Sequence, residues 1–138
     1  MIVVDEYIAI RALLGERPDQ LPDELLALPM TSHWRLLQRI HAPGTGQLSQ
    51  VLARLPLPDR LALRNPDPDV LQVLDPRPLL DDAAAIAARF GGTGLLVAET
   101  LASALQHGRM LWFGHPRNIG IRLGEAAHDL GITINLTV

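Results

Sequence analysis

Cysteine is absent from the 138-residue chain, and so is lysine. Without cysteine the chain has no disulfide bond, no thiolate nucleophile and none of the usual zinc clusters, so any bound metal would have oxygen or imidazole ligands. All 12 basic residues are arginine, which suits bidentate recognition of phosphate. The same composition is typical of a high-GC genome, and codon bias is the favoured explanation. The number of arginines is therefore not evidence for a function, and only the positions of individual arginines are informative.

Long hydrophobic runs are absent as well. No apolar run approaches the ~20 residues that a membrane span needs. No basic stretch precedes the opening Ile2-Val3-Val4, as a secretory signal would require. We therefore expect a soluble, cytoplasmic protein that makes no membrane contact. The formal net charge of −3 argues against a nucleic-acid binder that uses its whole surface, but it leaves room for a local basic groove.

Hydrophobic patterning predicts one domain, residues 1–138, in which strands and helices alternate. The clearest strands are 1–5, 110–113 and 132–138, with 110–113 expected near the centre of the sheet and 132–138 at an edge. A shorter strand is expected near residues 28–30. Helices are predicted at about residues 8–14, 31–40, 47–55, 79–90, 95–107 and 119–130. This order predicts an α/β fold, a three-layer α/β/α sandwich with a mainly parallel sheet.

Three details of these elements can be predicted. Thr31 or Ser32 is expected to cap the helix that follows, and Trp34 is expected on its inward, apolar face. Glu99 is expected on the solvent-facing side of its helix, opposite the apolar residues. The proline-rich segment 56–78 is expected to pack on the fold, because leucine and valine recur through it and a flexible linker would be poorer in them.

Polar residues follow three of the predicted strands. Asp5 and Glu6 follow the first strand, residues 31–35 the second, and residues 115–118 the strand at 110–113. In an open α/β sheet, ligands bind beyond the carboxyl ends of the strands, so we expect these segments to converge on one edge. An edge with acids, histidines, arginines and hydroxyls suits a divalent cation and a phosphodiester.

Each segment alone also has an ordinary structural explanation. Asp5 and Glu6 favour a helix N-terminus through the helix dipole. His33 and Arg35 suit a solvated helix face, where arginine pairs with nearby acids. His115 precedes a proline in a loop that any such fold needs. The three segments are therefore informative as a set and not singly.

Two stretches of the chain resemble a known family. The opening Met-Ile-Val-Val-Asp and the segment Leu-Val-Ala-Glu-Thr-Leu-Ala-Ser-Ala-Leu-Gln-His-Gly, followed by Met-Leu-Trp-Phe at 110–113, resemble PIN-domain proteins. These include the ribonuclease toxins of bacterial toxin–antitoxin modules. The resemblance spans most of the chain in element order and implies a PIN-like fold. It also implies that three or four carboxylates hold Mg²⁺ or Mn²⁺, which activates a water against an RNA phosphodiester.

The family's acidic positions are only partly kept. Asp5 matches the first acid, and Glu6 stands where the family usually has a hydroxyl residue. The internal glutamate falls in the segment that contains His33. The third acid aligns near Val97, and the fourth falls at or beside His115. Asp5 is thus the one acid that is clearly retained.

Two functions follow from this pattern. In the first, the chain is a divergent PIN-like toxin, an endoribonuclease in which Asp5, His33 and His115 are catalytic and Asp5 and Glu6 hold Mg²⁺ or Mn²⁺. The residues expected to bind substrate are Thr31, Ser32, Arg35, Arg117 and Asn118. In the second, the fold is catalytically inactive and sequesters RNA or a partner protein. The first is slightly favoured, because histidine and arginine stand at two former acid positions.

The remaining alternatives concern the fold and the partners. An unrelated α/β domain stays open as a third interpretation. The expected partners are RNA, an antitoxin protein and a second copy of the chain in a homodimer. The exposed faces of the helices after Gly44 are the expected surface for an antitoxin peptide or for the second copy. The sequence does not choose between them.

Overall fold

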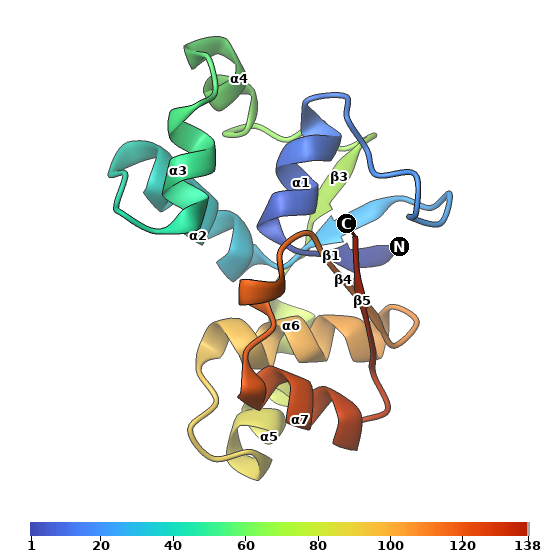
Figure 1. The fold of residues 1–138 in the computed structure, drawn as a ribbon. Helices are drawn as coiled ribbons and strands as arrows, with labels where there is room; N and C mark the ends of the chain where they lie inside the picture. Colours follow the sequence, from blue (N-terminus) through green and yellow to red (C-terminus); the bar gives the residue numbers. More distant parts are fainter. Residues whose placement is uncertain (138) are drawn as a thin grey trace.

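The computed structural model, which describes residues 1–137, has one parallel five-stranded sheet in the order β3-β2-β1-β4-β5 (Figure 1). The strands are β1 (Ile2–Val4), β2 (Leu26–Leu28), β3 (Leu71–Val73), β4 (Met110–Phe113) and β5 (Thr133–Leu136). The predicted α/β class with a parallel sheet is confirmed. Val138, the last residue of the predicted edge strand, lies outside the described residues.

Helices cover both faces of the sheet. The helices are α1 (Glu6–Leu13), α2 (Met30–His41), α3 (Gln47–Ala53), α4 (Leu57–Ala62), α5 (Leu80–Arg89), α6 (Leu95–Gln106) and α7 (Ile121–Asp129), with short 3₁₀ turns η1 (Arg77–Leu79) and η2 (Pro116–Asn118). In Figure 1, α1 lies on one face, α5, α6 and α7 lie on the other, and α2, α3 and α4 form a lobe beside α1. The three-layer sandwich is confirmed. Within residues 1–137, no helix has the length and apolar character needed to cross a bilayer.

Alternation along the strands builds two cores. Val3 and Leu111 face the α5–α7 layer, whereas Ile2 and Val4 face α1. All three residues of β1 are buried, because this strand is the middle one of the five. The expectation that 110–113 is central needs a small correction, since β4 lies one place from the centre. Residues 71–73 pair with β2, so the proline-rich segment packs on the fold as predicted.

The start of α2 differs from its prediction. The helix begins at Met30 directly after Pro29, without a side-chain cap, so Thr31 and Ser32 lie inside its first turn. Glu99 of α6 caps the N-terminus of α2 instead, because its Oε1 accepts a hydrogen bond of 3.4 Å from the Thr31 amide. Glu99 is buried, and its predicted exposure is wrong. The positive end of the α2 dipole stabilises this carboxylate from another helix. The periodicity of apolar residues in α6 does not reveal such a contact between helices.

The orientation of α2 is also different. Trp34 was expected inward, but 60% of its surface is exposed. The helix turns Leu36 inward, against Leu48 and Leu52 of α3. Because the lobe of α2, α3 and α4 shares a small core with Ile10 of α1, packing in that core decides which side of α2 is buried.

Candidate functional site

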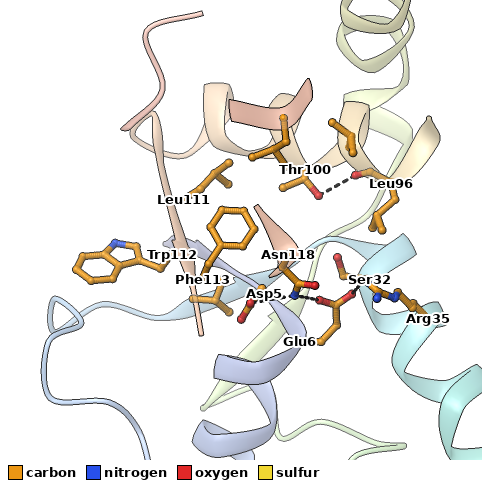
Figure 2. Close-up of a pocket in the computed structure, with 13 residues that line it drawn as sticks. Asp5, Glu6, Ser32, Arg35, Leu96, Thr100, Leu111, Trp112, Phe113 and Asn118 are labelled. Atoms are coloured by element: carbon orange, nitrogen blue, oxygen red, sulfur yellow. Dashed lines mark hydrogen bonds and ion pairs between the residues drawn. The ribbon is translucent and has the colours of Figure 1, made fainter. Parts of the chain in front are cut away.

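A cavity of about 50 Å³ lies at the carboxyl ends of β1 and β4 (Figure 2). Its polar lining comes from the residue between β1 and α1 and from α1, α2, α6 and η2, namely Asp5, Glu6, Ser32, Arg35, Thr100 and Asn118. The rest of the wall is apolar and includes Leu96, Val97, Leu111, Phe113 and Leu123. The ends of neighbouring parallel strands therefore do meet at one edge, which is where α/β folds place their ligands.

Asp5 is the most heavily bonded residue of the cavity. Its Oδ1 accepts a hydrogen bond of 3.0 Å from the Ile8 amide, so Asp5 is the N-cap of α1. Its Oδ2 accepts from the Gly114 amide at 2.9 Å and from the Asn118 side-chain amide at 3.0 Å. Only 5% of the residue is exposed. One carboxylate thus joins β1, the start of α1, the end of β4 and η2.

Gly114 makes this close approach possible. A Cβ built on Gly114 would lie 2.8 Å from Cβ of Tyr7 and 3.2 Å from the amide nitrogen of Ile8. Any other residue would push the end of β4 away from α1 and lengthen the hydrogen bond to Asp5. The chain therefore presents a backbone amide to Asp5 beside the place where the family resemblance puts its fourth acid.

Glu6 completes a carboxylate pair. Its Oε2 accepts a hydrogen bond of 3.1 Å from the same Asn118 amide nitrogen that serves Asp5, and its Oε1 lies 3.5 Å from a guanidinium nitrogen of Arg35. Glu6 is 3% exposed. In Figure 2 the Asn118 amide lies between the two carboxylates and Arg35 approaches Glu6 from α2. Asn118 therefore bridges two acids that would otherwise repel each other.

Burial dominates the titration of both acids. It raises the pKa of Asp5 above its ordinary value of 3.8, against the opposing effect of the hydrogen bonds from Ile8, Gly114 and Asn118. Burial also raises the pKa of Glu6 above 4.5, and the charge of Asp5 adds to the rise while Arg35 opposes it. Raised carboxyl pKa values in a cavity are typical of functional sites and also of buried structural networks.

The two histidines do not line this cavity. Nε2 of His33 lies 3.4 Å from the carbonyl oxygen of Leu63, on the α4 side of the lobe. Nδ1 of His115 accepts a hydrogen bond from the Arg117 amide, and its ring stacks on Tyr7 at 5.1 Å between centroids. Both side chains have protein partners, and their proposed catalytic roles stay predictions without support from this geometry.

The predicted substrate-binding residues divide into two groups. Ser32, Arg35 and Asn118 line the cavity, although Asn118 is committed to the two carboxylates. Thr31 lies in a neighbouring groove, and its hydroxyl oxygen is buried without a hydrogen bond. Arg117 is exposed and does not line the cavity. The predicted substrate-binding residues therefore lie near the same edge of the sheet, but they do not all face the cavity.

The donor set does not fit a resident Mg²⁺ or Mn²⁺. Among residues 1–137, no three His, Asp or Glu side chains are grouped closely enough to hold a metal ion. Each oxygen of Asp5 and Glu6 already has a protein donor or cation, and Val97, aligned with the third acid, contributes an apolar side chain to the wall. Mg²⁺ in proteins is often held by one or two carboxylates with waters completing an octahedron, but here the Asn118 amide nitrogen hydrogen-bonds to both carboxylates and lies where a shared ion would bind.

Sequence reasoning missed three contributors to this region. Gly114 acts through its backbone, Glu99 caps α2, and Leu96 forms part of the wall. A glycine directly after a buried strand is a recognised sign of close backbone approach, so Gly114 could have been found. Nothing in the apolar spacing of α6 separates Glu99 from an ordinary exposed acid.

Comparison of the chain with protein-family models, curated proteins and solved structures gives no significant match. The resemblance to PIN domains therefore stays a prediction from the residues, and the function has to be argued from the geometry of the chain itself.

Replacing Asn118 tests whether it holds the acid pair. Asn118→Ala removes the donor shared by two buried carboxylates, so we expect the free energy of unfolding to fall by about 1–3 kcal/mol. Chemical denaturation measures the change. The control, Asn65→Ala at an exposed position, should change stability by less than about 0.5 kcal/mol. Equal effects of the two variants would contradict the bridging role.

The raised pKa of Glu6 predicts a pH-dependent stability. The folded state binds the carboxyl proton more tightly than the unfolded chain, so the contribution of Glu6 is most favourable at low pH and declines above about 4.5. The free energy of unfolding of the wild type minus that of Glu6→Gln should therefore fall as pH rises from 4 to 7. Glu125→Gln, at an exposed glutamate, is the control for loss of charge. A difference that rises with pH would contradict burial as the dominant cause.

Proposed function

We propose that the chain is a PIN-like module that binds RNA without cutting it. The observation that carries the proposal is the unequal distribution of charge over the fold. Residues 30–66, which form the lobe of α2, α3 and α4, contain five arginines and one acid, Asp59, in a chain whose net charge is −3. The arginines are Arg35, Arg39, Arg54, Arg60 and Arg64. This is a local excess of positive charge that the net charge of the whole chain does not exclude.

These arginines are largely unpaired. Among residues 1–137, Arg35 is the one arginine of the lobe with an ion pair. Arg54 and Arg64 are exposed, and the Nε atoms of Arg39 and Arg60 are buried without a hydrogen-bond partner. The exposed, unpaired guanidinium groups of Arg54 and Arg64 attract a polyanion, because phosphates supply both the charge and the acceptors that they lack.

The acid pair supports binding over cutting. Asp5 and Glu6 are held by Asn118, Gly114 and Arg35, and their surroundings do not fit a resident metal ion. The network ties four elements of the fold together, which is a sufficient structural reason for two buried carboxylates. No step of phosphodiester hydrolysis follows from this arrangement.

Metal-dependent RNA cleavage by a divergent toxin is the second candidate. The observation that favours it is the burial of two acids with raised pKa values in a cavity at the carboxyl edge of the sheet. A toxin role and an antitoxin partner rest on the family resemblance alone.

Binding of a short fluorescein-labelled single-stranded RNA, followed by anisotropy in EDTA over a range of salt concentrations, tests the proposal. We expect affinity to fall with salt, because bound phosphates displace counterions. The double variant Arg54→Gln/Arg64→Gln should reduce the slope of log affinity against log salt by about 1.4, since each phosphate contact on a single strand contributes about 0.7. The matched control is Arg89→Gln/Arg122→Gln on α5 and α7, which changes the net charge equally.

The same RNA is then incubated with Mg²⁺ or Mn²⁺ and resolved on a denaturing gel. Intact RNA together with salt-dependent binding supports the proposal. Metal-dependent cutting that is lost in Asp5→Asn would replace it with the nuclease. Absence of RNA binding, or equal loss of affinity in the two double variants, would contradict the basic lobe as the binding surface.

A further inference from the structure

A second hollow adjoins the cavity, between the start of α2 and the start of α6. Its volume is about 390 Å³, within the range of roughly 300–1,000 Å³ that is usual for small-ligand pockets. It is lined by Met30, Thr31, Trp34, Arg35, Leu95 and Leu96. We call this hollow the α2–α6 groove. Arg35 and Leu96 also line the cavity, so the two spaces are neighbours.

The α2–α6 groove exposes large apolar side chains. The exposed fractions are 60% for Trp34, 62% for Leu95 and 41% for Met30. Single exposed apolar residues are ordinary, but these three surround one hollow. The aromatic face of Trp34 is the largest rigid surface among them.

The charges around the groove favour one kind of occupant. Arg35 lines the groove itself, and Arg39 follows it one turn later on α2. The groove thus combines an exposed aromatic ring with the guanidinium group of Arg35 on the same helix. Proteins that bind single-stranded nucleic acid combine these two features, since bases stack on aromatic rings while cations follow the phosphates.

We propose that the α2–α6 groove is a base-binding subsite, in which an unpaired base of single-stranded RNA stacks on Trp34 while Arg35 contacts a flanking phosphate. This inference rests on the proposed RNA binding and adds to it the strandedness of the RNA and the residue that recognises the base.

The test compares the full-length wild type with Trp34→Ala and Trp34→Tyr. A labelled single-stranded RNA and the same strand with abasic positions are the two probes. We expect Trp34→Ala to weaken binding of the intact strand by about 5- to 150-fold, and Trp34→Tyr to restore most of the affinity. Wild type and Trp34→Ala should bind the abasic strand equally. Ile121→Ala, at an exposed apolar residue of α7, is the control and should bind as the wild type.

Other outcomes have distinct meanings. If Trp34→Ala binds the intact strand as tightly as the wild type, the base-binding subsite is overturned while RNA binding by the lobe stands. Equal losses for the intact and abasic strands would overturn stacking. If the wild type sediments as a dimer and Trp34→Ala as a monomer, the groove holds a second copy of the chain, which also overturns the subsite. If no variant binds RNA, the proposed function itself fails.

Thermal melting of each variant by circular dichroism verifies that it is folded. Trp34 is largely exposed, so its replacement removes little buried surface and should leave the melting temperature close to that of the wild type. The recovery of affinity in Trp34→Tyr provides a second safeguard, because a tyrosine ring stacks on a base but does not repair a misfolded lobe.

Discussion

The hydrogen bonds accepted by Asp5 are the interaction on which the rest of the site depends. They cap α1, fix the end of β4 through Gly114 and hold η2 through Asn118, so four elements meet at one carboxylate. Gly114 is required because a side chain there would strike Tyr7 and Ile8. The residue that follows the central strand β1 therefore holds α1, β4 and η2 together. Glu6, the first residue of α1, joins the same network through Asn118.

This network limits the chemistry of the edge. Asp5 already uses three of its roughly four acceptor sites, and the apolar wall formed by Leu96 and Val97 adds no further ligand. The features suited to recognition lie beside the edge. The lobe of α2, α3 and α4 has unpaired arginines, and Trp34 stands exposed where that lobe meets α6. Arg35 connects the two regions, because it contacts Glu6 and lines the α2–α6 groove.

Much of the fold was predictable because the spacing of apolar residues along the chain differs between strands and helices. The short strand at 2–4 and the alternation near 133–136 are examples, and Asp5 was located correctly from its place after the first strand. The misses concern orientation. Trp34 and Leu36 both satisfy a helical pattern, and only packing on α3 decides which one is buried. Asn118 could be placed at the edge, but its commitment to two carboxylates depends on contacts between residues more than 100 positions apart.

Paramagnetic broadening by Mn²⁺ tests most directly whether the Asp5–Glu6 pair is a structural network and not a metal centre. The measurement is a titration of isotope-labelled protein with Mn²⁺, followed through the side-chain carboxyl signals of all the acids and the side-chain amide of Asn118. A pair held by protein donors predicts that Asp5, Glu6 and Asn118 broaden no more than exposed acids such as Asp81 and Glu125. Selective broadening of those three signals at low Mn²⁺ would contradict the structural role and restore the nuclease as the first candidate.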